Sequence, residues 1–520
     1  MENNFFGKMK DVYDDRKSVT ENGAIGYATT GKELLDLNFA VGSLRNDSEE
    51  SIQNRFAKAY FENPILAIKW LFYCMDVREG LGERRTGKVC VDWLVENREE
   101  VIKRLLKFIP EYSRWDNLFR LIDTGLKDDV SEIANKQFKE DMLNYKNGKS
   151  ISLAAKWAFS VNCSNKDNKR LGRLLAKSLK LSDEEYRKML SVLRKHIDVV
   201  ERKMCAKEWS EINYEAVPSR ANLIYNDAFL RNDEERRREY LGALSKGEAK
   251  INSSVLFPHD IVHKYMYIYR SLKSLDEAIE AMWKGLPDYI NGKENILVVG
   301  DGSGSMYTRV DQKSGVMAVD VANALAIYFA ERMSGEFANK YITFGGNPHL
   351  VDFSNCKSLR DKINLAMKNS DCSNTDINKV FKLVLDTAVK NKMSQEDMPG
   401  SILIISDMEF DSGCYFAESG HYNSRNYVHG FNRPTLFDGI SREYEAYGYH
   451  LPKLIFWNVN SRTGTIPVKR NEAGVILVSG FSPAVCKIIL SNKTDPYEAL
   501  LETLNSKRYQ PIEEAVKDII

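Results

Sequence analysis

Oxygen-bearing side chains follow three short apolar runs in the C-terminal half of this 520-residue chain. Asp301, Ser303 and Ser305 come directly after NILVVG, Thr375 precedes INKVFKLVL, and Asp407 ends SILIISD. The runs NILVVG and SILIIS are typical of strands buried on both faces of a parallel sheet. Because ligands gather at the carboxyl ends of such strands, we expect these side chains to converge. Hydroxyl and carboxylate oxygens without Cys or His suit Mg²⁺, with Mn²⁺ or Ca²⁺ also compatible.

The sequence around these residues alternates between strand and helix patterns. KYITFGG, HLVDF, KLIFWNVN and GVILVSG are predicted strands, and VMAVDVANALAIYFAERM and INKVFKLVLDTAVKNKM are predicted helices. This alternation predicts a doubly wound, Rossmann-like parallel sheet over residues 291–520. Residues 408–450 show little periodicity and are expected to form an insertion above the sheet edge. A fragment from about Lys284 to Ile520 should then fold alone.

The first 290 residues are expected to be helical. Apolar positions recur at intervals of three and four in PILAIKWLFYCMDV, VDWLVENREEVIKRLLKFI and DEEYRKMLSVLRKHIDVVERKM. Short polar breaks such as KNGKS separate these segments. Helices joined by short loops favour a HEAT-like repeat domain over residues 1–290, although no strict period is present. An irregular helical domain is the alternative.

Positive charge is concentrated in one part of the chain. The net charge is +1 overall, yet residues 101–207 hold 24 Lys/Arg against 14 Asp/Glu, while residues 291–520 hold 25 against 27. Within the basic stretch, NKDNKRLGR places Lys166, Lys169, Arg170 and Arg173 within eight residues. These cations either meet the phosphates of a nucleic acid or simply solvate a helix and pair with acidic neighbours such as Asp167.

Other patterns exclude several classes of protein. The eight cysteines form no CxxC pair, so neither a zinc site nor a disulfide framework is indicated. No apolar run is long enough for a signal peptide or a membrane span, and a cytoplasmic location is expected. GERRTGKV nearly matches a phosphate-binding loop, but Val89 stands where that loop needs a hydroxyl, so we interpret it as a turn between helices. Hydrolase activity, including that of a metal-dependent hydrolase, is the less favoured hypothesis, because DGSGS lacks the second Asp of a phosphate-transferring DxDx motif and Ser303 lacks the GxSxG context of a serine nucleophile.

The strand-end residues resemble a known metal site. Asp-x-Ser-x-Ser, followed by a Thr and an Asp after later strands, is similar to the metal-ion-dependent adhesion site of von Willebrand A domains over about residues 293–490. The resemblance implies that Ser303, Ser305 and Thr375 contact the metal directly. It implies that Asp301 and Asp407 act directly or through water, and that one coordination position is left for a carboxylate of a protein partner.

The order of the two halves also resembles a family. A helical-repeat region followed by an A-type domain is the layout of the TROVE/Ro ribonucleoproteins, which bind misfolded and small non-coding RNAs. MDVREGLGERR, IPEYSRWDNLF, SLAAKWAFS and KINSSVLFPHDIVHKY are closer still to a related family of unknown function. The resemblance implies a non-catalytic RNA-binding scaffold with a metal-dependent docking site. The alternative is a protein-interaction module that captures an acidic residue through the metal, without nucleic acid.

Overall fold

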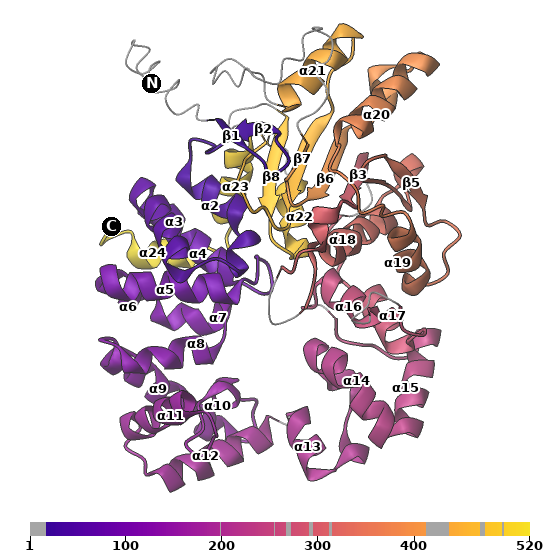
Figure 1. Cartoon of the computed structure of the whole chain (residues 1–520). Coiled ribbons are helices and arrows are strands. Elements are labelled where there is room, and N and C mark those ends of the chain that lie inside the picture. Colours follow the sequence, from indigo (N-terminus) through magenta and orange to yellow (C-terminus); the bar gives the residue numbers. More distant parts are fainter. Residues whose placement is uncertain are drawn as a thin grey trace. The chain divides into compact units, whose positions relative to one another are not determined.

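A computed structural model describes residues 17–197, 199–253, 255–266, 272–290, 295–310, 315–411, 436–467, 474–490, 493 and 495–520. The chain divides into two compact units, which are described separately below (Figure 1). Unit 1 comprises Met1–Glu62, Phe257–Asp276 and Leu286–Leu504. Unit 2 comprises Asn63–Leu256, Glu277–Gly285 and Asn505–Ile520.

Unit 1 is built on a six-stranded sheet in the order β5-β4-β3-β6-β7-β8. Its strands are β3 (Ile296–Asp301), β4 (Lys340–Phe344), β5 (His349–Asp352), β6 (Ser401–Ser406), β7 (Lys453–Asn458) and β8 (Val475–Ser479). All six predicted strands are therefore confirmed. The sheet is parallel except for β5, which runs antiparallel to β4 because only a short turn joins the two. The expectation of a wholly parallel sheet is wrong at this edge.

Helices cover both faces of the sheet. Trp457 of β7 packs against Phe329 of α18 (Ala318–Arg332), while its neighbour Phe456 packs against Phe437 of α21 (Leu436–Ala446). Successive residues of a strand point to opposite faces, so α18 and α21 lie on opposite sides. The other helices of unit 1 are α2 (Glu33–Ala40), α3 (Glu49–Glu62), α16 (Pro258–Tyr265), α19 (Leu359–Lys368), α20 (Asn378–Asn391), α22 (Cys486–Ile489) and α23 (Pro496–Leu504).

The expected insertion over residues 408–450 is only partly described. Residues 412–435 lie outside the described residues. The segment after them is the helix α21 rather than irregular chain, because its apolar side chains Leu436, Phe437, Ile440 and Tyr444 recur at helical spacing and are buried.

Unit 2 is helical in the part that the structure describes. Its helices are α4 (Pro64–Met75), α5 (Arg84–Asn97), α6 (Glu99–Leu105), α7 (Ile109–Tyr112), α8 (Trp115–Phe119), α9 (Lys127–Lys146), α10 (Ala154–Trp157), α11 (Lys166–Ser178), α12 (Asp183–His196), α13 (Val200–Ala206), α14 (Ser219–Asn232), α15 (Glu234–Lys246), α17 (Glu277–Lys284) and α24 (Gln510–Val516). Local capping fixes several starts: Asn63 caps α4, and Ser182 with Glu185 forms a capping box at α12. GERRTGKV lies mostly in α5, so its interpretation as an inter-helix turn is corrected. Among the described residues, no helix has the length and apolarity needed to cross a membrane.

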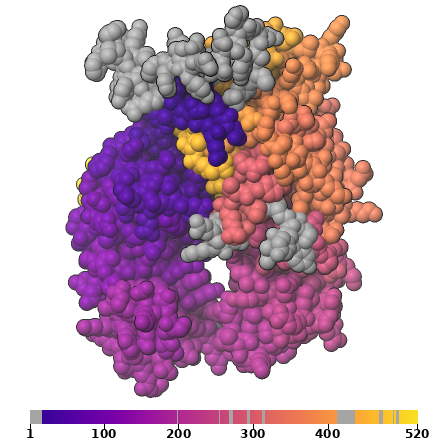
Figure 2. All heavy atoms as spheres, viewed as in Figure 1, coloured from indigo at the N-terminus to yellow at the C-terminus, as the bar shows by residue number. Residues whose placement is uncertain are grey.

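The N-terminal segment of the chain belongs to the sheet unit, a division that differs from the boundary expected at residue 290. Two short strands, β1 (Lys17–Val19) and β2 (Ile25–Tyr27), precede α2. Tyr27 exchanges two main-chain hydrogen bonds with Ile466, at 2.7 and 2.8 Å. Helix α2 packs on β8, and the Gly42 amide beyond it donates to Ser479 Oγ at 2.9 Å. Figure 2 shows this segment in indigo beside the yellow C-terminal part of unit 1.

The C-terminal helix instead belongs to the helical unit. Helix α24 packs on α4 and α6. The buried ammonium of Lys69 donates to Asn505 Oδ1 at 2.6 Å and to Glu513 Oε2 at 2.7 Å. The buried carboxylate of Asp76 accepts from Arg508 and Tyr509. These paired buried charges would be left uncompensated if α24 were removed from unit 2.

The division of the chain into units 1 and 2 predicts which fragments fold on their own. A fragment of residues 284–520 lacks α2 on β8 and carries α24 without its partner helices, so we now expect it to be poorly soluble. Residues 17–62 joined through a flexible linker to residues 257–504 should be soluble and melt in one cooperative thermal transition. Circular dichroism of the two fragments makes the comparison. Equal cooperativity in both would show that the N-terminal segment is dispensable to unit 1.

Candidate functional site

The ends of β3 and β6 place two carboxylates at one edge of the sheet. The two strands are parallel neighbours, with Gly300 paired to Ile405, so Asp301 and Ser406 end them side by side. Asp301 is fully buried; its Oδ2 accepts from Ser406 Oγ at 2.6 Å and its Oδ1 accepts from the Ser303 amide at 2.9 Å. Asp407, also fully buried, follows directly. The sequence-predicted convergence at this edge is therefore observed for both carboxylates.

The loop after β3 brings two hydroxyls to the same edge. A 3-10 turn, η6 (Gly304–Tyr307), sets Ser303 Oγ 2.9 Å from Ser305 Oγ, with Ser303 buried and Ser305 half-buried. The glycines between these residues are needed for close approach. A Cβ on Gly302 would lie 2.8 Å from Thr343 Oγ1, which is closer than side-chain carbons come. The sequence DGSGS thus packs a carboxylate and two hydroxyls into one tight loop.

Thr375 reaches this edge on a second loop. The Gly304 amide donates to Ser373 O at 3.0 Å and the Cys372 amide donates to Gly302 O at 3.1 Å, which holds the two loops together. Thr375 is buried, and its hydroxyl accepts from Asn22 Nδ2 at 3.3 Å. Hydrogen bonds therefore connect Asp301 to Ser303 and Ser303 to Ser305. Thr375 is held at the same edge by the main-chain hydrogen bonds between its loop and the loop after β3.

One oxygen of Asp407 is left without a hydrogen bond. Asp407 Oδ1 accepts from the Glu409 amide at 3.2 Å, whereas the buried Oδ2 has no hydrogen-bond donor among the described residues. Its nearest cationic atom is Arg462 Nη2 at 3.5 Å. The following residue, Met408, adopts the left-handed conformation at φ 62°, which is strained for a side-chain-bearing residue. A buried, unsatisfied carboxylate oxygen beside a strained residue is typical of a functional site.

Burial controls the ionisation of both carboxyls. Desolvation raises the pKa of Asp301 from 3.8 to about 6, against the lowering effect of the Ser406 and Ser303 hydrogen bonds. Desolvation, with the added charge of Asp301, raises the pKa of Asp407 to about 7, while Arg462 and the Ser305 hydroxyl oppose the rise. Two buried carboxylates this close are costly to ionise together without a compensating cation.

A buried glutamate that sequence reasoning missed organises the rim of the site. Glu409 accepts from the amides of Glu21, Arg462 and Thr463 at 2.8, 2.8 and 2.9 Å. It thereby fixes the loop that carries Arg462 toward Asp407, and it fixes the N-terminal loop that carries Asn22. In the sequence, the one indication of this role is that Glu409 lies two positions after Asp407. Its partner Glu21 lies 388 residues earlier in the chain, so no local pattern records their contact.

The donor set fits a hard divalent cation. No cluster of three or more His, Cys, Asp or Glu side chains suited to a metal occurs in the described ranges. The strand-end group instead combines two carboxylates with three hydroxyls, and it contains the orphaned Asp407 oxygen. Oxygen donors with low total charge are the ligands that Mg²⁺ accepts.

A second feature lies in unit 2, on one face of α11. Lys166, Lys169, Arg170 and Arg173, together with Lys177, line one surface hollow of about 410 Å³. Their spacing puts them on one stripe of the helix, while Leu175 and Ala176 face the core. Arg170 is paired with Asp123, and Arg173 Nε lies 3.3 Å from Asp183. Within the described chain, the three lysines have no acidic partner.

The fold and sites define a protein of two units, one helical and one an α/β sheet with an oxygen-lined carboxyl edge. The chain belongs to the family described as Domain of unknown function (DUF2828), whose model matches residues 20–110 and 111–294. A model described as Domain of unknown function (DUF7788) matches residues 295–518. The chain is also similar to an uncharacterized protein of Acanthamoeba polyphaga mimivirus, at 28% identity over 538 residues, covering 95% of this chain and 88% of the relative.

The raised pKa values predict the pH dependence of metal binding. A cation binds the ionised carboxylates, so protons compete with it below the folded-state pKa values of about 6 and about 7. Apparent Mn²⁺ affinity, measured by calorimetry, should rise steeply between about pH 5.5 and about pH 7.5. Without metal, the stability of the fold has the opposite pH dependence to that of metal affinity. Because the folded pKa values of about 6 and about 7 lie above 3.8, the free energy of unfolding falls as pH rises from about 4 to about 7.

The substitution Asp301→Asn separates metal binding from the stability of the metal-free protein. It should abolish Mn²⁺ binding, yet in metal-free buffer near neutral pH it should melt no lower than the wild type, because a buried charge is removed. Glu396→Gln, an exposed carboxylate of unit 1 away from the site, is the control and should change neither property. Unchanged Mn²⁺ affinity in Asp301→Asn would contradict the metal assignment.

Proposed function

We propose that this protein is a non-catalytic RNA-binding or ribonucleoprotein-scaffold protein, with the helical unit as the RNA platform and the α/β unit as a metal-dependent docking module. The observation that carries the RNA assignment is the stripe on α11. Four cations singled out by the sequence, joined by Lys177, line one hollow. A stripe of cations along a helix is the electrostatic footprint of phosphate binding.

The docking assignment rests on the strand-end site of unit 1. Asp301, Ser303, Ser305, Thr375 and Asp407 would hold a divalent cation, most simply Mg²⁺. The bound ion would supply a coordination position for a carboxylate of a protein partner, as the resemblance to von Willebrand A domains implies. The orphaned Asp407 oxygen and the buried hydroxyls support this role, and the resemblance to TROVE/Ro proteins supports its combination with RNA binding.

A protein-docking function without nucleic acid is the second candidate, and one observation favours it. Arg170 and Arg173 pair with Asp123 and Asp183, which is how an ordinary solvated helix satisfies its charges. Exposed pairs of this kind are weak, so phosphates can displace them. The two candidates therefore differ in whether the three lysines and two arginines of α11 contribute to binding of RNA.

Charge reversal on α11 tests the RNA assignment. Lys166→Glu with Lys169→Glu should weaken binding of an oligouridine and of a hairpin RNA at least about tenfold. For the single strand, the log–log salt slope should become shallower by about 0.7 for each phosphate that the variant no longer binds. Lys246→Glu with Lys250→Glu is the control, because both are exposed lysines of unit 2 outside the hollow. Filter binding at several salt concentrations provides the measurement. Equal weakening in the two double variants, or no binding at low salt, would favour docking without RNA.

A further inference from the structure

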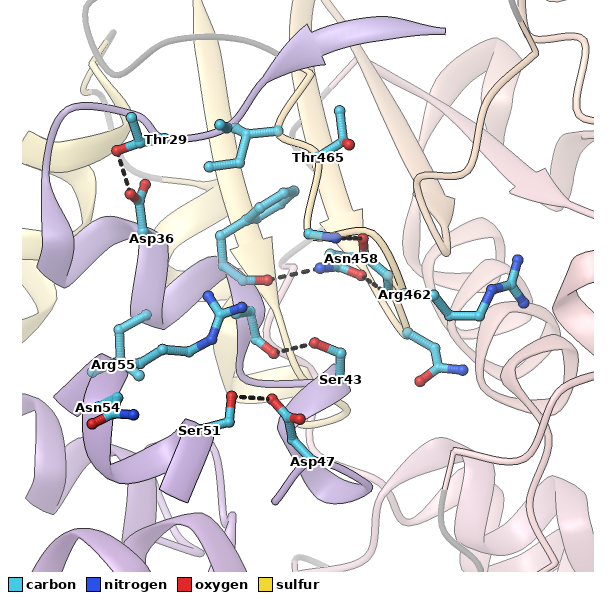
Figure 3. Close-up of a pocket in the computed structure, with 18 of the residues that line it drawn as sticks. Thr29, Asp36, Ser43, Asp47, Ser51, Asn54, Arg55, Asn458, Arg462 and Thr465 are labelled. Atoms are coloured by element: carbon cyan, nitrogen blue, oxygen red, sulfur yellow. Dashed lines mark hydrogen bonds between the residues drawn. The ribbon is translucent and has the colours of Figure 1, made fainter. Parts of the chain in front are cut away.

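A large cavity opens in unit 1 between the N-terminal helices and the loops beyond η6 and β7. Its volume is about 1050 Å³, and it is lined by α2, α3, the turn η1 (Ser43–Arg45), Thr308–Arg309 and residues from Asn458 to Ile466 (Figure 3). This exceeds the volume of roughly 300–1,000 Å³ that small-molecule pockets usually have. The cavity therefore has room for an extended segment of polypeptide.

The side chains of the cavity are mostly amides, hydroxyls and charges. Asn54, Asn460, Ser43, Ser48 and Ser51 are among them. Such groups can pair with the main-chain N–H and C=O of a bound peptide. The lining also contains both signs of charge: the glutamates Glu33 and Glu50, and the cations Arg55, Lys58, Arg309 and Arg462. Mixed charge suits a peptide better than a polyphosphate, whose concentrated negative charge the glutamates would repel.

Two acidic groups of the lining accept hydrogen bonds from neighbouring residues. Asp36 accepts from the Thr30 amide at 2.8 Å and from the hydroxyls of Thr29 and Thr30. Asp47 accepts from Ser51 Oγ at 2.7 Å. These carboxylates therefore hold the N-terminal loops in place.

Three of the four cations that line the cavity are not paired in this way, whereas Arg462 lies beside Glu21 and Asp407. Arg55, Lys58 and Arg309 have no acidic partner in the part of the chain that the structure describes. Arg55 is half-buried, and Figure 3 shows it extending from α3 across the cavity. Its Nη2 atom would lie only 3.9 Å from a Cβ on Gly464, so it reaches the loop after β7. A partly desolvated guanidinium without a partner is suited to bind a carboxylate.

The cavity adjoins the strand-end site. Arg462, one of its lining residues, lies 3.5 Å from Asp407 Oδ2 and donates from Nη1 to Ser305 O at 3.4 Å. Another lining residue, Asn460, donates to Thr308 Oγ1 at 3.0 Å, just beyond the loop that carries Ser303 and Ser305. A ligand in the cavity can therefore extend to the candidate metal centre without leaving unit 1.

We propose that this cavity binds an acidic peptide segment of a protein partner at two points. One carboxylate of the peptide is directed to the strand-end site, and a second carboxylate is bound by Arg55. This inference rests on the proposed docking function and adds its partner class: a polypeptide with two separated acidic residues. The N-terminal segment, which supplies Arg55, thereby acts as a specificity element for the docking site.

A random-peptide display library tests the proposal on the full-length protein in Mg²⁺. Selection should enrich peptides with two acidic residues, and synthetic versions should bind at least about tenfold more weakly to Arg55→Ala. Replacing the peptide's second acid with its amide should weaken binding equally, and that effect should disappear in Arg55→Ala. Arg309→Ala, on a different segment, should also weaken binding. Arg442→Ala, on the exposed face of α21 outside the cavity, should leave binding unchanged.

The outcomes separate this inference from the docking function. Peptides that need Mg²⁺ and Asp301 but bind Arg55→Ala equally well would overturn the cavity assignment and leave metal-dependent docking intact. Peptide binding that does not depend on Mg²⁺ would instead remove the docking function. Saturable, Arg55-dependent binding of ATP or inorganic phosphate, without enrichment of acidic peptides, would assign the cavity to small anions. Arg55→Ala must keep the wild-type melting profile and Mn²⁺ affinity for these comparisons to hold.

Discussion

Two buried carboxylates at the ends of neighbouring strands are the constraint around which unit 1 is organised. Asp301 and Asp407 are both removed from water, and desolvation raises the pKa of each. The surrounding chain supplies what water would otherwise provide: the Ser303 amide and the Ser406 hydroxyl for Asp301, and the Arg462 guanidinium for Asp407. These supports leave Asp407 Oδ2 without a hydrogen-bond donor among the described residues, and this observation supports the proposed divalent cation.

A third buried carboxylate, that of Glu409, explains why distant segments meet in unit 1. Buried Glu409 binds the amides of Glu21 and Arg462, so one carboxylate fixes both the N-terminal loop and the loop after β7. The N-terminal loop then brings Asn22 to Thr375. The helices that follow it form one wall of the cavity. Support of the strand-end residues and formation of the cavity therefore depend on the same N-terminal segment.

Local patterns predicted the six strands and the position of Asp301 and Asp407 at strand ends, because burial on both faces leaves an apolar run such as NILVVG or SILIIS in the sequence. The assignment of helices to units could not be predicted in this way. Helix α2 is buried on most of its surface and helix α24 buries Ile512 and Val516, but neither sequence says which unit covers these side chains. Long-range contacts, such as Gly42 with Ser479 and Lys69 with Glu513, show that assignment. The antiparallel direction of β5 and the role of Glu409 likewise depend on tertiary contacts that no periodicity records.

The central claim is that the strand-end oxygens hold a divalent cation. Crystals of the full-length protein grown with MnCl₂ would test it most directly, because anomalous scattering identifies manganese and its ligands. We expect an anomalous peak bonded to the hydroxyls of Ser303 and Ser305, with Thr375, Asp301 and Asp407 around it. A structure at saturating Mn²⁺ with no peak there, and with Arg462 still the only cation beside Asp407, would contradict it.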